Sequence, residues 1–202
     1  MRLEARNVAG ERGGDIIFSG VNVSLGEGEG LIITGASGSG KSTFLRIRAG
    51  LLEPAEGEII LEGATEEFPT LAAATHYLGH QNSMKPALSV SENLAFWQAF
   101  NGEPHLTIPE ALDMVGLETI GHLPFGYLST GQRRRIAIAK LLVSWRPVWL
   151  LDEPTAGLDK ASERQFAELM TAHMEGGGII VAATHIPLGL DTVTTFDMGA
   201  HV

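Results

Sequence analysis

A glycine-rich segment limits the folds that this chain can adopt more than any other stretch does. Residues 35–43 read Gly-Ala-Ser-Gly-Ser-Gly-Lys-Ser-Thr and fit the pattern G-x-x-x-x-G-K-[ST]. The short apolar run at residues 31–34 predicts a buried strand before the segment, and residues 42–49 predict a helix that ends at Gly50. Strand, glycine loop and helix in this order predict a phosphate site, because glycines let backbone N–H groups crowd around phosphate oxygens. A glycine-rich turn that binds nothing is the alternative that this context disfavours.

The residues of this phosphate loop are expected to play different parts. Lys41 supplies a full positive charge to the β- and γ-phosphates, and Ser42 offers a hydroxyl to Mg²⁺. The helix that follows adds partial positive charge at its N-terminus. Further contacts to the nucleotide are expected from Gly35, Ala36, Ser37, Gly38, Ser39, Gly40 and Thr43.

Length and charge limit the class of protein. The 202 residues suit one α/β domain with a small insertion. The formal net charge of −10 argues against nucleic acid as a partner, although residues 133–135 form a local basic run. The chain contains no cysteine, which excludes disulfides and thiolate metal sites.

Targeting signals are missing from the sequence as well. No stretch approaches the roughly 20 apolar residues that span a bilayer. Residues 1–6 lack the apolar core of a signal peptide. We therefore expect a cytoplasmic protein, with any membrane role coming through a partner.

The hydrophobic pattern of the first part of the chain predicts a β-rich layer beside the phosphate loop. Residues 3–8 are expected as a strand that Gly10 breaks. Residues 21–25 alternate apolar and polar side chains, as a half-buried antiparallel strand does. Further strands are expected at residues 58–61 and 74–78.

Helices are expected between Gln81 and about Trp145, and strands return after them. Residues 89–92 and 107–110 each fit a capping box, which predicts helix starts there. A later helix at residues 160–174 should bury one face, made of Phe166, Leu169, Met170 and His173. The later strands are expected at residues 148–151, 179–183 and 193–198.

Alternating strands and helices predict an α/β fold with a mostly parallel core sheet. An N-terminal antiparallel β layer and a helical insertion complete this P-loop NTPase arrangement. We expect a single domain over residues 1–202. Its nucleotide-binding core comprises residues 1–80 and 146–202, and its helical subdomain comprises residues 81–145.

Two acids follow the apolar strand at residues 148–151. Consecutive side chains of a strand point to opposite sides, so Asp152 and Glu153 are expected to take different roles. Asp152 is expected to hold Mg²⁺, and Glu153 is expected to polarise the attacking water as a general base. Acids after a strand also cap helices, but the phosphate loop upstream favours catalysis.

Residues 128–132, which read Leu-Ser-Thr-Gly-Gln, resemble the LSGGQ signature of ATP-binding-cassette (ABC) ATPases. Gln81 falls where that family has its Q-loop glutamine, and residues 154–159 resemble the segment that runs into the D-loop. His185 follows an expected strand and matches the switch histidine. The resemblance covers essentially the whole chain, with its motifs in register.

The resemblance implies ATP hydrolysis in a homodimer that closes head-to-tail over two ATP molecules with Mg²⁺. Lys41, Glu153 and His185 would act in catalysis, and Gln81 would join Ser42 and Asp152 at the metal. Contacts to the nucleotide of the other copy are expected from Ser129, Gly131, Gln132 and Asp159. Residues 133–135 place three arginines in the first turn of a helix, where cations oppose the helix dipole. A region facing phosphate and a solvated arginine face are both compatible with them.

Two positions depart from the family pattern. Arg12 lies near the place of an aromatic residue that stacks on adenine in many members. A guanidinium can stack on a base, and weaker adenine contact with looser selectivity between ATP and GTP is the alternative. Thr130 stands where the signature usually has glycine.

Residues 78–82 and 84–88 are similar to the Q-loop region of the ATPase subunits of cytochrome c maturation haem transporters. Residues 131–134 and 182–189 carry the same similarity. It implies a peripheral protein on the cytoplasmic face of the bacterial inner membrane that works with integral-membrane permease subunits. The expected docking surface is residues 79–90. Direct haem binding by this chain is not expected.

Two other functions remain open from the sequence. The chain could serve as the ATPase subunit of another small ABC exporter, or as a soluble ABC ATPase without a transport role. Soluble ABC proteins that act on nucleic acid usually carry two cassettes or a coiled-coil insertion, and this sequence has neither.

Overall fold

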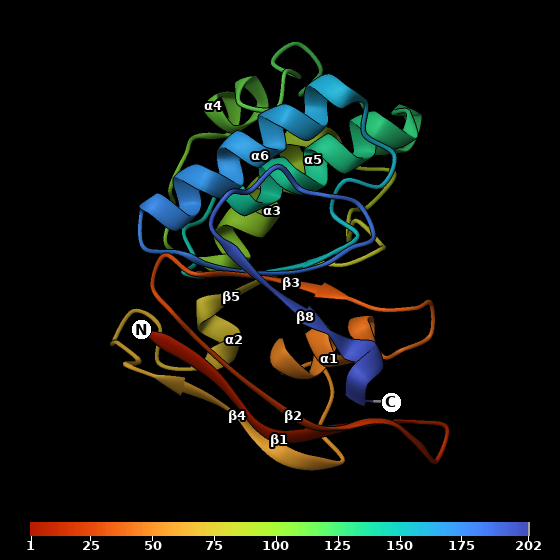
Figure 1. The fold of residues 1–202 in the computed structure, drawn as a ribbon. Helices are drawn as coiled ribbons and strands as arrows, with labels where there is room; N and C mark the ends of the chain where they lie inside the picture. Colours follow the sequence, from red (N-terminus) through yellow and green to blue (C-terminus); the bar gives the residue numbers. More distant parts are fainter. Residues whose placement is uncertain (202) are drawn as a thin grey trace.

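The computed structural model describes residues 1–201 and places helix α1 (Lys41–Arg48) between two β-sheets (Figure 1). The larger sheet is parallel, with strand order β5–β6–β7–β3–β8. Its strands are β3 (Gly30–Thr34), β5 (Thr75–Leu78), β6 (Val148–Asp152), β7 (Ile179–Ala183) and β8 (Val193–Asp197). The smaller sheet is antiparallel and consists of β1 (Arg2–Arg12), β2 (Asp15–Gly26) and β4 (Glu56–Glu62). The predicted α/β fold with an antiparallel layer is therefore confirmed.

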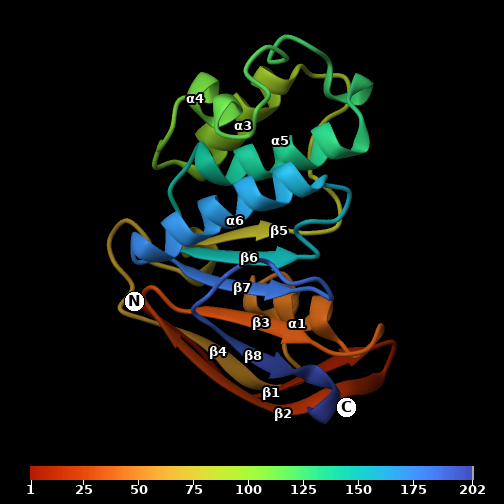
Figure 2. The same cartoon turned by 45° about the horizontal axis from the view of Figure 1, so that its top comes forward.

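Helices cover the face of the larger sheet that lies opposite α1 (Figures 1 and 2). They are α3 (Val90–Asn101), α4 (Ile108–Asp113), α5 (Thr130–Leu142) and α6 (Lys160–Glu175). Three short helices complete the chain: α2 (Leu71–Ala74), η1 (Phe125–Tyr127) and η2 (Met198–His201). No helix within residues 1–201 has the length and apolar character that crossing a membrane requires.

Capping residues explain where the covering helices begin. The Ser89 hydroxyl accepts the Glu92 N–H at the start of α3, and the Glu92 carboxylate accepts the Ser89 N–H. Thr107 and Glu110 form the same reciprocal pair at the start of α4. Both capping boxes satisfy N–H groups that a helix start leaves free, as the sequence predicts.

The strand β3 lies inside the larger sheet, although it comes early in the chain. Ile32 of β3 is paired with Ala182 of β7 on one side and with Thr195 of β8 on the other. Both neighbours of β3 therefore come from the last part of the chain.

The core has two layers, one on each face of the larger sheet. Along β6, Trp149 and Leu151 pack with the covering helices, whereas Val148 and Leu150 pack around α1. The expected apolar face of α6 is buried. One charged group lies in the layer around α1: Arg48 is fully buried, its guanidinium lies 5.2 Å from the Phe44 ring centroid, and burial lowers its pKa to about 9.

Three expectations about element boundaries are wrong. Gly10 does not end the first strand, because β1 continues to Arg12. A Cβ at Gly10 would lie 2.3 Å from Cε1 of Phe18, so the glycine serves close packing rather than chain reversal. Ala74 belongs to α2, and Met198 belongs to η2.

Candidate functional site

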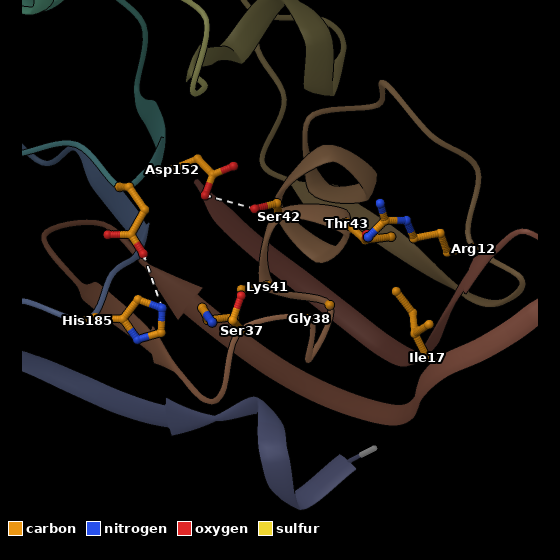
Figure 3. A pocket seen from close by; sticks show the side chains of 11 residues that line it. Arg12, Ile17, Ser37, Gly38, Lys41, Ser42, Thr43, Asp152 and His185 are labelled. Carbon is orange, nitrogen blue, oxygen red and sulfur yellow. Dashed lines mark hydrogen bonds and ion pairs between the residues drawn. The ribbon is translucent and has the colours of Figure 1, made fainter. Parts of the chain in front are cut away.

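A pocket of about 260 Å³ lies where the phosphate loop meets the ends of β6 and β7 (Figure 3). Its lining comes from four separate stretches of chain: the β1–β2 hairpin, the phosphate loop, the end of β6 and the loop after β7. The lining residues are Arg12, Ile17, Ser37, Gly38, Gly40, Lys41, Ser42, Thr43, Asp152, Glu153 and His185.

The phosphate loop leads directly into α1 without a side-chain cap. Gly40 is the N-cap residue of α1, with a φ of 92° that favours glycine, and no side chain accepts a hydrogen bond from the first turn. The first-turn N–H groups, with the positive end of the helix dipole, are therefore available to an anion.

Lys41 is the first residue of α1, and its side chain folds back onto the phosphate loop. Its side chain is buried, and its Nζ donates to the carbonyls of Gly35 at 2.8 Å and Ala36 at 2.9 Å. The loop is thus wrapped around an ammonium group that no carboxylate neutralises among the described residues. Ser39 is buried behind the loop, and its N–H donates to the Ala36 carbonyl. Gly35, Ala36 and Ser39 shape the loop but do not line the pocket.

Two oxygen-bearing side chains meet beside the loop. The Ser42 hydroxyl, from α1, donates to Oδ1 of Asp152 at the end of β6 over 3.0 Å (Figure 3). Tyr77 approaches the other carboxylate oxygen, and burial raises the pKa of its phenol. Residues 1–201 contain no group of three or more His, Asp or Glu side chains arranged to hold a metal ion. The Ser42 and Asp152 oxygens suit Mg²⁺, which takes its remaining ligands from phosphates and water.

Glu153 lines the same pocket as Asp152, so the expectation that the two acids point to opposite sides is wrong. The strand ends at Asp152, and Glu153 adopts a left-handed backbone with a φ of 44°. That conformation interrupts the alternation of side chains and is uncommon for a residue other than glycine. The Glu153 N–H donates to the Ala183 carbonyl at 2.8 Å, which holds the turn against β7.

The two ends of the pocket have different chemistry. Nε2 of His185 lies 3.5 Å from Oε1 of Glu153 at one end. Arg12 and Ile17 lie at the other end, beyond Gly38 and Thr43 (Figure 3). The phosphate loop runs between the ends, so a nucleotide can lie with its base near Arg12 and its last phosphate near His185.

Several predicted site residues do not reach this pocket: Gln81, Ser129, Gly131, Gln132 and Asp159. Gln81 is exposed on the loop after β5. Ser129 caps α5 in a capping box with Gln132, and Asp159 caps α6 by accepting the Ser162 N–H at 2.8 Å. One chain by itself therefore assembles only part of the predicted site.

Of the arginines at residues 133–135, Arg134 does not belong to a solvated face. Arg134 is 5 % exposed and donates to four backbone carbonyls, with burial lowering its pKa. The acceptors are the carbonyls of Gly79 (2.9 Å), Asp152 (3.1 Å), Glu153 (2.8 Å) and Pro154 (2.9 Å). Arg133 donates to the Gly126 carbonyl and Arg135 to the Val115 carbonyl.

Sequence reasoning missed Arg134 as a residue that positions the site. It ties α5 to the loop that leads to Gln81 and to the turn that carries Glu153. The helical spacing could have predicted that Arg134 is buried. Arg134 shares a helix face with Ala137, Ile138 and Leu141, which are all buried.

Comparison with known sequences gives consistent matches over nearly the whole chain. The family described as ABC transporter matches residues 18–156. A protein from a Chelativorans species is 64% identical over 99% of both chains, and one from Mesorhizobium japonicum is 66% identical over 95% of both. Both are named cytochrome c biogenesis ATP-binding export protein CcmA.

Solved structures with the same fold include dimers. A dimeric bacterial ABC transporter cassette is 27% identical with a TM-score of 0.82, over 98% of this chain and 95% of that one. A dimeric post-hydrolysis cassette bound to ADP and Pi is 29% identical with a TM-score of 0.78, over 91% of this chain and 88% of that one.

Proposed function

This chain belongs to the ABC transporter family of ATP-binding proteins, and we propose that it is the ATP-hydrolysing subunit of an export complex for cytochrome c biogenesis. The observation that carries the proposal is the pocket in which Lys41, Ser42, Asp152, Glu153 and His185 meet. The relatives named CcmA support the assignment to cytochrome c biogenesis, because the identity extends over almost the full length of both chains.

Phosphate binding is the first task of the pocket. We assign it to the phosphate-loop N–H groups at the start of α1 and to Lys41, which exchanges its carbonyl partners for phosphate oxygens. Ser42, Asp152 and Gln81 would hold Mg²⁺, which neutralises phosphate charge when bound. At the other end of the pocket, Arg12 and Ile17 would cover the two sides of the adenine.

Hydrolysis requires an acceptor for the proton of the attacking water. Glu153 is the carboxylate of the pocket that Ser42 does not engage, so we assign it as the general base. His185, 3.5 Å from Glu153, would contact the γ-phosphate and hold the carboxylate in place. The left-handed turn at Glu153 and its bond to Ala183 fix the base relative to the phosphate loop.

A second copy of the chain would complete the site. Ser129, Gly131, Gln132 and Asp159 lie at or near helix starts outside the pocket. A head-to-tail homodimer would bring them to the nucleotide of the other copy, and the dimeric cassettes with the same fold support this arrangement. The helices of residues 81–145 would then act as the subdomain that carries Ser129 to that nucleotide.

We infer that the export role involves a membrane partner, and the relatives named as export proteins support this inference. We propose that the chain sits on the cytoplasmic face of the bacterial inner membrane, bound to integral-membrane subunits. Cytochrome c biogenesis would then depend on ATP turnover by this chain. No side chain in the pocket is assigned to haem.

The test is complementation of a bacterium that lacks its own CcmA. The wild-type chain should restore c-type cytochromes, measured by the staining of covalently bound haem, and the Lys41→Ala variant should not. Restoration by Lys41→Ala would refute the requirement for ATP. Failure of a stably expressed wild-type chain, with its membrane subunits present, would refute the assignment to cytochrome c biogenesis.

A further inference from the structure

Tyr127 is a large side chain that the fold leaves in solvent, close in the chain to a predicted nucleotide contact. It ends η1 and lies two residues before Ser129, which caps α5. Tyr127 is 83% exposed, whereas its turn neighbours Phe125 and Leu128 are each 5% exposed. A single exposed ring is common on protein surfaces, so the surroundings of Tyr127 decide whether it has a role.

The turn that carries Tyr127 is fixed. The Gly126 N–H donates to the Pro86 carbonyl at 2.9 Å, and a Cβ at Gly126 would lie 3.1 Å from that oxygen. The Arg133 guanidinium donates to the Gly126 carbonyl at 2.6 Å and lies 5.8 Å from the Phe125 ring centroid. A ring presented by such a turn loses little conformational freedom on binding, which favours a role in recognition.

Tyr127 lies within reach of a nucleotide that Ser129 contacts. The backbone is extended at Leu128 (φ −75°, ψ 149°) and at Ser129 (φ −64°, ψ 163°). Two extended residues separate the Cα atoms of Tyr127 and Ser129 by about 7 Å, and the phenol adds further length. With Ser129 at the last phosphate of the nucleotide, the Tyr127 hydroxyl can therefore reach past the other phosphates to the ribose.

The ribose is the part of the nucleotide to which no side chain in the pocket of one chain has been assigned. Arg12 and Ile17 are assigned to the base, and the phosphate loop with Lys41 is assigned to the phosphates. The acids and His185 are assigned to Mg²⁺, the attacking water and the γ-phosphate. A ribose presents hydroxyl groups, and a phenol hydroxyl can both donate a hydrogen bond and accept one. Tyr127 therefore has the chemistry that the ribose requires.

We propose that Tyr127 of one copy binds the ribose of the nucleotide held by the other copy, with a hydrogen bond between the phenol and a ribose hydroxyl. The inference rests on the proposed head-to-tail homodimer, and it names a part of the substrate that the homodimer recognises besides phosphate. A site that pairs with a hydroxyl group rejects analogues that lack it, because its polar group then stays without a partner. Closure of the dimer thereby becomes selective for ribonucleotides.

Other roles for the ring fit less well. Packing of Tyr127 within its own chain contributes little, because the residue is largely exposed. Stacking on the adenine is disfavoured, because the two sides of the base are assigned to Arg12 and Ile17. The ribose is the contact that uses both the position of Tyr127 and its hydroxyl.

The test measures how much nucleotide is needed to form the closed dimer when no membrane subunit is present. Glu153→Gln serves as the starting chain, because it should bind ATP without consuming it. The probes are ATP and dideoxy-ATP, which lacks both ribose hydroxyls. We expect the dimer to form at an ATP concentration about 10-fold below the dideoxy-ATP concentration, as measured by size-exclusion chromatography.

The added substitution Tyr127→Phe keeps the ring and removes the hydroxyl. It should raise the ATP requirement about 10-fold and leave the dideoxy-ATP requirement unchanged. Thr171→Val is the matched control, because it removes an exposed hydroxyl of α6 that donates to the Ala167 carbonyl, and it should preserve the preference for ATP. The affinity of the dilute single chain for ATP should not change in Tyr127→Phe, since the contact forms only on closure.

The outcomes separate this inference from the proposed function. Failure of the Glu153→Gln chain to form a dimer at any ATP concentration would refute the proposed homodimer. Equal dimer formation with ATP and dideoxy-ATP, or a preference for ATP that survives Tyr127→Phe, would refute the ribose contact and leave the homodimer standing. Weaker ATP binding by the single Tyr127→Phe chain would place Tyr127 at its own nucleotide and overturn the proposal.

A photocrosslinker then shows which copy supplies the contact. At low ATP concentration, a chain with Lys41→Ala and p-benzoylphenylalanine in place of Tyr127 should hold little nucleotide of its own. Radioactive ATP should label this chain when the Glu153→Gln chain is added, and not in its absence. Labelling of the chain alone, or no labelling within a mixed dimer, would overturn the proposal.

Discussion

The N-termini of α1 and α5 are both expected to contact nucleotide phosphate, but they are built in opposite ways. The start of α1 at Gly40 has no side-chain cap and opens into the pocket. The start of α5 is closed on itself, because the Ser129 hydroxyl accepts the Gln132 N–H at 3.2 Å and the Gln132 side-chain oxygen accepts the Ser129 N–H at 2.9 Å. One helix start has no side-chain cap, and the other has two of its backbone N–H groups satisfied by the capping box.

The difference predicts an order of binding. A nucleotide can bind at the α1 start of a single chain without displacing any capping group. At the α5 start, the Ser129 hydroxyl accepts one hydrogen bond and keeps its own proton to donate. Because its Gln132 N–H is already engaged, the α5 start offers fewer free donors than the α1 start. We therefore expect α5 to act second, on nucleotide bound to another copy.

The largest expected effect is on ATP hydrolysis in the closed dimer. In that state the α1 start of one copy and the α5 start of the other are expected to contact the same phosphate. Glu153→Gln removes the proposed base and keeps the shape of the side chain, so ATP hydrolysis should fall about 1000-fold. ATP should still bind, and the closed dimer should accumulate because release requires hydrolysis. Phosphate release and size-exclusion chromatography with ATP measure the two effects, with the exposed Glu118→Gln as control. Normal turnover in Glu153→Gln would exclude Glu153 as the base.

The next prediction distinguishes the role of the α1 start in ATP binding from the role of the α5 start in turnover. Lys41→Ala should weaken ATP binding to the isolated chain about 100-fold, because the loop loses its full charge. Ser129→Ala should leave that affinity unchanged and lower only the turnover of the dimer. Titration calorimetry on dilute protein, followed by turnover at rising protein concentration, distinguishes the two variants. Equal loss of affinity in both variants would mean that the α5 start does contact nucleotide within its own chain.

A smaller effect is expected from Arg134, which links the α5 helix to the turn of Glu153. Arg134→Met should lower the free energy of unfolding by about 2 kcal/mol, because several buried carbonyls lose their donor. In folded protein at low temperature, turnover should fall more than ATP affinity, and Arg134→Lys should recover part of it. Urea unfolding and steady-state kinetics test both statements. An unchanged kcat in folded Arg134→Met would show that the link does not position the base.

The smallest expected effect is a pH-dependent change in stability. It involves residues 144–147, which connect α5 to β6. Nε2 of His76 donates to the Ser144 carbonyl at 2.9 Å, and Nε2 of His173 donates to the Pro147 carbonyl at 3.3 Å. Burial lowers the pKa of His76 to about 3 and that of His173 to about 4. Below about pH 6.5 the unfolded chain takes up protons that the folded chain refuses, so stability falls as the pH falls.

Between pH 7 and pH 6 the free energy of unfolding should drop by about 1 kcal/mol from these two histidines. His173→Phe should remove about half of that drop, as measured by urea unfolding at both pH values. Hydrogen exchange should show that residues 144–147 loosen before α1 does. An unchanged pH dependence in His173→Phe would contradict burial of a neutral histidine.

Features that depend on neighbouring residues could be predicted from the sequence. The phosphate loop, the capping boxes at Ser89 and Thr107, and the buried face of α6 all follow from residues within a few positions of one another. The strand order could not be derived in this way, because pairing between β3 and β8 joins segments far apart in the chain.

The parts of the site that escaped prediction share this dependence on distant contacts. The turn at Glu153 is held by Ala183, and Arg134 reaches the carbonyl of Gly79. Residue type alone assigned Arg134 and its neighbours to a surface, since nothing local indicates which arginine is buried.

The position of β3 has a consequence for synthesis of the protein. The strand that leads into the phosphate loop leaves the ribosome early, but both of its neighbours, β7 and β8, are translated last. Until then the loop is attached to a strand without a sheet, and a nascent chain cannot hold a nucleotide firmly. We therefore expect ATP binding only after β7 and β8 have been made, so a ribosome-bound chain arrested after Glu175 should retain no ATP analogue.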